Sequence, residues 1–195
     1  GTHEYIKSNN IKNLAWFKLD KDNGLYFALN EALRNINGNW VLVLGADDIL
    51  FDFKSLENLY IKLNNFLKQN ISSNQVNFYT NIYIKRASGI ILKKYPEFNS
   101  FSNMYDGLPP IHHQTLLMNS IFLNNGLFFN TAYKIHSDYD LMCSLMNSSK
   151  FVKIEIAIVV YNDAGMSSSI KTLFRSFFEI YKIRILINLI IHIFS

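Results

Sequence analysis

The sequence predicts an α/β fold in which helices flank an open sheet. A run of five apolar residues, 40–44, is typical of a short strand buried on both faces. Apolar residues recur at helical spacing between 25 and 36, and Gly38 stands where that helix should end. Residues 76–86 alternate apolar and polar side chains, which is the pattern of a strand. The chain of 195 residues has the length and apolar content for one domain with its own core.

The remaining elements follow from the same patterns. The spacing predicts helices over residues 55–69 and from 137 onward, strands over 90–92, 115–118 and 151–161, and loops over 95–110 and 163–169. The step from Ser88 to Gly89 should join two of the strands as a hairpin. Ser137 can cap the helix that it begins, and Asp140 completes a capping-box arrangement three residues later.

An acidic pair comes after the first predicted strand. The apolar run stops at Gly45 and Ala46 and leads directly to Asp47 and Asp48. In an open α/β sheet, ligands bind at the carboxyl ends of the strands. Adjacent carboxylates repel each other unless a cation or proton lies between them, and a divalent cation that carries a phosphate group would satisfy both. The alternative is a simple turn, because two aspartates after a strand can cap the next element of the chain.

The residues before and within this pair follow a spacing that is found in a known protein family. They are Asp22, Gly24, Tyr26, Ala28, Asn30, Gly38, Trp40, Asp47 and Asp48. Their spacing resembles the middle of a family 2 glycosyltransferase of the GT-A type. In such enzymes an Asp-x-Gly-x-Tyr-x-Ala-x-Asn segment precedes a helix, a Gly-x-Trp step and a strand that ends in an acidic motif. The resemblance implies a GT-A-like, Rossmann-type mixed sheet flanked by helices.

Three later segments resemble the same family in the expected order. Residues 109–114, which end in His113 and Gln114, are similar to the His-Gln element before the acceptor side. Residues 137–141 are similar to the acidic element that supplies the catalytic base, and Asp138 is the candidate base within it. Residues 162–167 are similar to the Gly-Gly-x-Ser loop after the last strand.

The sequence also departs from the family pattern. It opens at Gly1 and Thr2, which match the tail of the family's Asp-Gly-Ser-x-Asp-Gly-Thr segment. We therefore expect a fragment or a naturally shortened protein in which the first nucleotide-binding βα units are missing. Gly45 stands where many relatives carry a further aspartate, so one potential metal ligand is absent. The expected organisation is a partial GT-A domain over residues 1–169 and an amphipathic helix over 170–195.

The resemblance implies a glycosyltransferase of the hexosyltransferase type that uses a nucleotide-sugar donor and a saccharide or lipid-linked acceptor. Bacterial surface polysaccharide or glycolipid synthesis is the implied setting. Asp47 and Asp48 would bind Mg²⁺ or Mn²⁺ at the donor diphosphate, and Asp138 would act as the general base of an inverting reaction. The other implied site residues are Asp22 and Asn30 on the donor side, and His113, Gln114, Gly165 and Ser167 on the acceptor or phosphate side.

Several of these residues have a plain structural alternative. Asp138 and Asp140 stand at a helix start, where the helix dipole favours carboxylates in any protein. Asp140 is the reserve candidate for the base. A lone histidine such as His113 is more often a satisfied structural residue, and His112 beside it complicates the choice. The sequence has no zinc-type Cys/His spacing, phosphate-binding P-loop or dinucleotide-binding glycine motif.

The C-terminal segment carries most of the net charge. Four basic residues and one acidic residue from position 171 onward contribute +3 of the total +4, so the rest of the chain is nearly neutral. A nearly neutral body argues against a nucleic-acid-binding surface. Basic and aromatic residues recur at helical spacing over 171–182, and the apolar stretch 185–194 is about half the ~20 residues that span a bilayer.

These features predict an amphipathic helix on the inner surface of the cell membrane, with the protein cytoplasmic and peripheral. The alternative is a helix packed on its own domain or on a second subunit. Two other functional classes also stay open. One is a truncated, non-catalytic glycosyltransferase-like protein that acts as a binding or assembly module, and the other is a hydrolase that uses Asp47 and Asp48 on phosphate esters.

Overall fold

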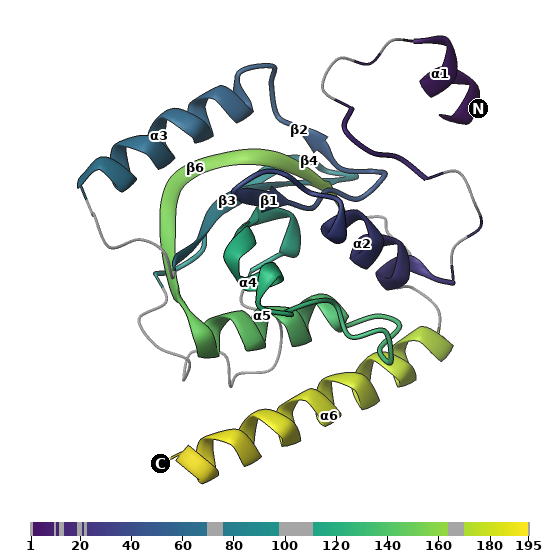
Figure 1. Ribbon diagram of the computed structural model, residues 1–195, viewed down its shortest axis with the longest axis vertical. Helices are drawn as coiled ribbons and strands as arrows, with labels where there is room; N and C mark the ends of the chain where they lie inside the picture. The colour runs from purple at the N-terminus through teal and green to yellow at the C-terminus, as the bar shows by residue number, and fades with distance from the viewer. Residues whose placement is uncertain are drawn as a thin grey trace.

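A computed structural model describes residues 2–9, 11, 14–18, 21, 23–69, 76–97, 111–163 and 170–194. The chain forms a mixed sheet flanked by helices, which confirms the predicted fold class (Figure 1). In spatial order the strands are β1 (Trp40–Leu42), β5 (Leu116–Asn119), β3 (Val76–Arg86), β6 (Lys150–Asn162) and β2 (Ile49–Leu50), with β4 (Gly89–Lys93) paired to β3. β3 and β6 are parallel, and the other described pairs are antiparallel.

Helices lie on both faces of this sheet. The described helices are α1 (Thr2–Ser8), α2 (Leu25–Arg34), α3 (Ser55–Gln69), α4 (Ser120–Asn124), α5 (Ser137–Ser148) and α6 (Ile170–Phe194), of which α1 lies apart from the sheet (Figure 1); a short 3-10 turn, η2 (His113–Thr115), leads into β5. Figure 1 shows α3 on one side of the sheet, α4 and α5 on the other, and α6 beyond α5. In the described part of the chain, no helix is long and apolar enough to cross a membrane.

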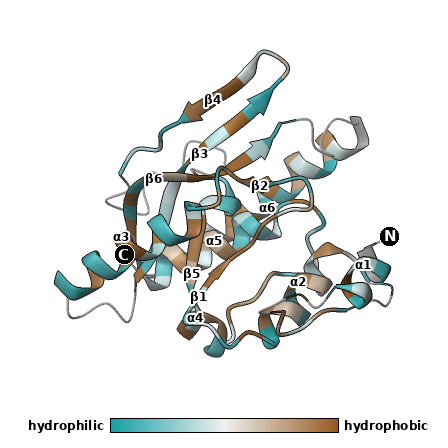
Figure 2. Ribbon diagram, turned by 90° about the horizontal axis from the view of Figure 1, so that it is seen from above, coloured by the Kyte–Doolittle hydropathy of each residue, from teal (hydrophilic) through white to brown (hydrophobic). Residues whose placement is uncertain are grey.

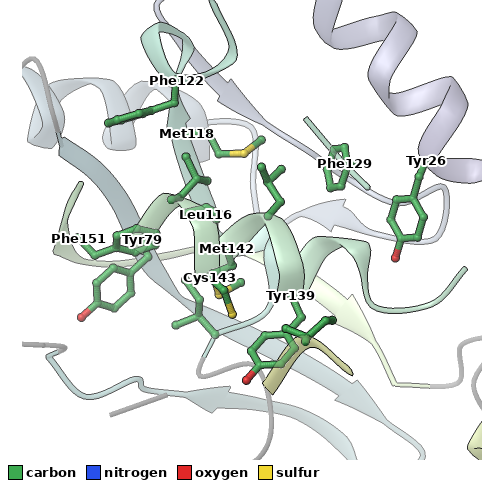
Figure 3. Close-up of a cluster of buried hydrophobic side chains, with 14 of the residues drawn as sticks. Tyr26, Tyr79, Leu116, Met118, Phe122, Phe129, Tyr139, Met142, Cys143 and Phe151 are labelled. Atoms are coloured by element: carbon green, nitrogen blue, oxygen red, sulfur yellow. The ribbon is translucent and has the colours of Figure 1, made fainter. Parts of the chain in front are cut away.

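Two apolar clusters form the core, one on each face of the sheet. Phe78 belongs to the cluster beneath α3, and its neighbour Tyr79 belongs to the cluster on the α5 side. Both side chains are 0% exposed. Successive residues of a strand point to opposite faces, so β3 contributes to both clusters. Figure 3 shows the second cluster, in which Tyr79 and Met142 lie among other large side chains.

β3 differs from a one-sided strand, because its polar residues are buried too. Asn77 accepts a hydrogen bond from Asn119 N–H at 2.8 Å and donates to Ser149 Oγ at 2.6 Å. Asn81 likewise accepts from Tyr95 N–H at 3.0 Å. These amides satisfy polar groups of neighbouring segments inside the protein, which removes the cost of burying them.

The first predicted strand is shorter and less buried than the sequence indicated. β1 contains three residues instead of five, and all three are only half-buried. Among the described strands β1 pairs with β5 alone, at the edge of the sheet. The expectation of a strand buried on both faces was wrong because an apolar run cannot tell an edge strand from a central one. The hairpin predicted at Ser88 and Gly89 is present as β3 and β4, which extend beyond the other strands (Figure 2).

The predicted capping box at the start of α5 does not form. The N-cap residue is His136, without a side-chain cap, and Ser137 is already the first helical residue. Ser137 Oγ is buried and has no hydrogen-bond partner among the described residues. The helix begins one residue earlier than a serine cap would place it. The other predicted helices and strands agree with the structure, whereas most of the loops predicted at 95–110 and 163–169 lie outside the described residues.

Candidate active site

Strand directions bring three separate segments to one end of the sheet. β1 and β5 are antiparallel with Leu42 opposite Leu117, so the end of β1 lies beside the start of β5. β5 is antiparallel to β3, and β3 is parallel to β6, so the end of β6 reaches the same end of the sheet. The acidic turn after β1, His113 before β5 and Tyr161 near the end of β6 therefore gather at this end.

The acidic pair sits in a tight turn between β1 and β2. Gly45 N–H donates to Asp48 Oδ2 at 2.7 Å, and Asp48 N–H donates to Gly45 O at 3.2 Å. A Cβ atom added to Gly45 would lie 2.9 Å from Asp48 Oδ2 and 3.2 Å from Asp47 Oδ1. Both carboxylates thus converge over Gly45, where a larger residue would displace them.

One oxygen of this pair fits a cation site. Asp48 is 9% exposed, and its Oδ1 is buried with no hydrogen-bond partner among the described residues, whereas Asp47 is exposed. A buried carboxylate oxygen without a partner is costly, and a bound cation would remove that cost. In the part of the chain that the structure describes, no cluster of three or more His, Cys, Asp or Glu could hold a metal. The turn instead fits Mg²⁺-type binding, in which one or two carboxylates share the ion with water and substrate phosphates.

Aromatic side chains connect the acidic turn with the start of β5. Burial raises the pKa of Tyr161, and nearby carboxylates, Asp48 and Asp47 among them, raise it further. The Tyr161 ring lies 5.0 Å from the His112 ring, and His112 Nδ1 is hydrogen-bonded to the Tyr95 hydroxyl. Burial, helped by neighbouring positive charges, lowers the pKa of His112 to about 4. His112 is therefore neutral at physiological pH and packs the site instead of carrying charge.

Asp138 lies in the first turn of α5 and pairs with His113. His113 Nδ1 is 2.9 Å from Asp138 Oδ2, and Tyr139 N–H donates to Asp138 Oδ1 at 2.9 Å. Burial alone would raise the pKa of Asp138, but the hydrogen bond and charge of His113 outweigh it and hold that pKa below its usual range. The Asp138 side chain is 21% exposed. It is thus ionised at neutral pH, as a group that accepts a proton must be, and it is partly exposed.

Two neighbouring candidates, Asp140 and Gln114, lie in different surroundings. Asp140 is half-buried, and burial raises its pKa despite a hydrogen bond from Asn130. Gln114 is 5% exposed, and its Oε1 has no hydrogen-bond partner among the described residues. Asp138, which pairs with His113, keeps the stronger case for the base. The predicted role of Gln114, which is to hold sugar hydroxyls, stays a prediction.

Asn30 and Tyr26 have a structural place in α2. Asn30 Nδ2 donates to Phe129 O at 2.8 Å, and its Oδ1 accepts from Phe129 N–H at 2.9 Å. The Tyr26 ring stacks on Phe129 at 5.5 Å, and its hydroxyl donates to Ile135 O at 2.5 Å. Both side chains hold the segment that leads into α5. Among the described residues no contact supports the donor-side role expected for Asn30, which stays a prediction.

Sequence reasoning did not assign Glu179, which lies in α6. It accepts backbone hydrogen bonds from Lys134, Ile135 and His136, just before the turn that carries Asp138. The one available signal was that Glu179 is the only acidic residue among the basic and aromatic residues of the C-terminal segment. Of the other predicted site residues, Asp22, Gly165 and Ser167 lie outside the described residues.

The chain is similar in sequence to proteins that are named as glycosyltransferases. Proteins of Mycobacterium tuberculosis and Mycobacterium bovis named "PGL/p-HBAD biosynthesis glycosyltransferase" are 24% identical to this chain over 159 residues. The match covers 77% of this chain and 56% of those proteins, so the chain spans little more than half the length of the curated relatives. No family model matches the sequence.

Solved structures show a similar fold. The structure titled S. aureus TarS 1–349 in complex with UDP has a TM-score of 0.55 at 13% identity, over 79% of this chain and 42% of that one. TarS 1–349 without the nucleotide in its title has a TM-score of 0.53 at 15% identity, over 72% of this chain and 40% of that one. This chain is therefore similar in sequence to glycosyltransferases and in fold to TarS.

Proposed function

We propose that this chain is part of an inverting glycosyltransferase of the GT-A type that moves a hexosyl group from a nucleotide-diphosphate donor to a hydroxyl acceptor. The pairing of Asp138 with His113 carries the proposal. It supplies an ionised, reachable carboxylate at the end of the sheet where the acidic turn also lies. The similarity to proteins named glycosyltransferases supports the same reaction class.

In this reaction Asp138 accepts the proton of the acceptor hydroxyl while the acceptor oxygen attacks the anomeric carbon of the donor sugar. The bond from that carbon to the diphosphate oxygen breaks, and its electron pair leaves with the nucleotide diphosphate. Attack from the face opposite the leaving group inverts the anomeric centre. His113 holds the Asp138 carboxylate in place and favours its ionised form until the proton is transferred.

Asp47 and Asp48 are the residues that would hold Mg²⁺ or Mn²⁺. The orphaned Asp48 Oδ1 and the convergence of both carboxylates over Gly45 support this assignment. A bound divalent cation would neutralise negative charge on the leaving diphosphate. Burial raises the pKa of Tyr161, and the charges of Asp163, Asp48 and Asp47 raise it further.

The names of similar proteins support a proposal for the donor and acceptor classes. A TarS structure is titled as a complex with UDP, and the mycobacterial relatives are named for a biosynthetic glycosyltransferase. We infer a UDP-sugar donor and a saccharide or lipid-linked acceptor in bacterial surface polysaccharide or glycolipid synthesis.

Calorimetric titration with UDP, with and without Mn²⁺, tests the donor site. We expect Mn²⁺-dependent binding that Asp47→Ala abolishes and Asp138→Asn preserves. Asp138→Asn should instead lower sugar transfer by roughly 10²- to 10⁴-fold, the usual contribution of a general base. Glu57→Gln, an exposed acid on α3, is the matched control that should change neither quantity.

Other outcomes identify other functions. UDP binding without transfer, also on a chain extended at its N-terminus, would indicate a non-catalytic binding module. Release of the sugar to water in the presence of an acceptor would indicate a hydrolase. Full Mn²⁺-dependent activity in Asp47→Ala would refute the metal assignment.

We further propose that the protein attaches to the inner face of the cell membrane through the outer face of α6. Four aromatic side chains there are at least half exposed: Phe174 67%, Phe177 67%, Phe178 59% and Tyr181 56%. Exposed Arg175 and Lys182 lie along one side of these rings. An exposed aromatic face bordered by cations matches the surface of an anionic bilayer, where rings enter the headgroup region and cations contact phosphates. This charge complementarity favours a lipid surface over a second copy of the protein.

A further inference from the structure

The carboxylate of Glu179 binds three successive backbone N–H groups before α5. Lys134 N–H donates to Glu179 Oε1 at 2.9 Å, while Ile135 and His136 N–H donate to Glu179 Oε2 at 2.9 and 3.0 Å. The Glu179 side chain is 8% exposed. Removing a carboxylate from water is costly, and charge-assisted hydrogen bonds of this kind offset the cost.

Glu179 belongs to a line of contacts along α6. Ser176 Oγ is 2.6 Å from His136 Nε2, and Ile183, one turn beyond Glu179, is 1% exposed in the core. The buried side of α6 therefore packs against the segment that enters α5, while its aromatic face points away. This arrangement makes α6 an integral part of the domain.

The same segment is held from its other side by α2. The Tyr26 hydroxyl of α2 donates a hydrogen bond to the backbone oxygen of Ile135, and Glu179 of α6 accepts one from the backbone N–H of Ile135. Both helices therefore hold this residue. Asp138 comes three residues later. His136, the N-cap residue of α5, makes no side-chain cap. The N–H groups that Glu179 binds precede the first helical turn, so Glu179 fixes the backbone that enters α5 and places a negative charge near the start of this helix, where the helix dipole favours an anion.

We propose that Glu179 is a positioning residue for Asp138, so that α6 sets the geometry of the catalytic base. The proposal rests on the function proposed above, in which Asp138 takes the acceptor proton. A shift of the helix start would move Asp138 relative to His113 and to the acceptor hydroxyl. Misplacement of a reacting group by about 1 Å can cost roughly 10²-fold in rate.

The variant Glu179→Gln tests this role, because it keeps the shape of the side chain but replaces the charged acceptor. We expect two changes in the full chain. Amide hydrogen exchange of Tyr139 and Asp140 should become at least roughly tenfold faster, since the first turn of α5 loses its anchor. In transfer assays with UDP-glucose or UDP-N-acetylglucosamine, kcat should fall by roughly 10²-fold while the Kd for UDP stays unchanged.

Two further variants separate positioning from loss of stability. Glu179→Asp keeps the charge on a shorter stem and should restore part of kcat. Glu57→Gln makes the same acid-to-amide change on an exposed site of α3 and should alter neither exchange at Tyr139 nor kcat. In an Asp138→Asn background, Glu179→Gln should have little further effect on kcat, since both changes act through one carboxylate.

The possible failures are distinguishable. Unchanged exchange at Tyr139 in Glu179→Gln would overturn the positioning role whether or not turnover is observed. Unchanged kcat in Glu179→Gln, together with a large loss in Asp138→Asn, would also overturn it while leaving the proposed function intact. Full activity of Asp138→Asn would instead refute the proposed function itself.

Discussion

His113 Nδ1 lies 2.9 Å from Asp138 Oδ2, and this pair joins the start of β5 to the first turn of α5. The two residues are 25 positions apart and belong to different elements. Their contact ties the proposed base to the end of the sheet that also carries the acidic turn. The pair opposes the effect of burial on Asp138 and keeps its carboxylate ionised.

Replacing His113 should move the acid limb of the pH–rate profile. In the wild type, the pKa of Asp138 lies below its usual range, so kcat/KM falls only as the pH drops through that low value. His113→Phe removes the hydrogen bond and the charge but keeps Asp138 buried, and burial raises a carboxyl pKa. We expect the acid limb of kcat/KM to shift to higher pH.

His113→Asn is the comparison for that experiment, because an amide can still donate one hydrogen bond to Asp138. Its acid limb should lie between those of the wild type and His113→Phe. An acid limb that stays in place in both variants would show that His113 does not control the ionisation of Asp138.

A substitution at Gly45 tests the proposed cation site in the acidic turn. Gly45→Ala would place a Cβ 2.9 Å from Asp48 Oδ2, so at least one carboxylate must move. We expect Mn²⁺-dependent binding of UDP to weaken by tenfold or more, measured by calorimetry, with little loss of thermal stability. Gly38→Ala is the matched control, since the nearest atom to its added Cβ would be Trp40 O at 3.4 Å. Equal UDP affinity in both variants would contradict the convergence of the carboxylates on a cation.

Patterns of local spacing predicted most helices and strands of this chain. α3 and β6 follow from periodicity, and the acidic turn follows from an apolar run that stops at Gly45. These features depend on neighbours in the sequence. By contrast, the segment that leads to Asp138 is held by Glu179, which is more than 40 residues away in the sequence. Local sequence patterns do not predict a contact over such a separation.

The same reason explains the weaker sequence predictions. Ser137 has the sequence context of a cap, but His136 is the N-cap residue of α5, and Glu179 binds the N–H groups of residues 134–136 that lead into it. The exposure of β1 depends on which strands lie beside it, which the apolar run alone does not show. Asn30 matched a family motif, yet its amide binds Phe129, a partner 99 residues away.

Asn30 provides a test that separates scaffold from donor binding. Asn30→Leu leaves the backbone N–H and C=O of Phe129 without partners in a buried place, at a cost of about 1–3 kcal/mol for each group. We expect a clear drop in the free energy of unfolding, measured by urea denaturation. The Kd for UDP of the remaining folded protein should be unchanged. A weaker Kd with unchanged stability would assign Asn30 to the donor site instead.

The outer face of α6 predicts binding to anionic bilayers. Each basic residue near such a surface contributes about 1 kcal/mol, so Arg175→Glu with Lys182→Glu should weaken binding by roughly thirtyfold or more. Cosedimentation with vesicles that contain phosphatidylglycerol, compared with vesicles of phosphatidylcholine alone, measures this effect. The control pair is Lys62→Glu with Lys68→Glu, the same charge change on exposed positions of α3.

Aromatic replacement on the same face separates lipid insertion from charge attraction alone. Phe177→Ser with Phe178→Ser removes two rings that are 67% and 59% exposed, so the fold should keep its thermal stability. We expect binding to phosphatidylglycerol vesicles to weaken and the remainder to become more sensitive to salt, because electrostatic attraction is screened while ring insertion is not. Unchanged vesicle binding in this variant would show that the rings do not enter the bilayer. Concentration-dependent dimers that this variant abolishes, without vesicle binding by the wild type, would assign the face to a second copy of the chain.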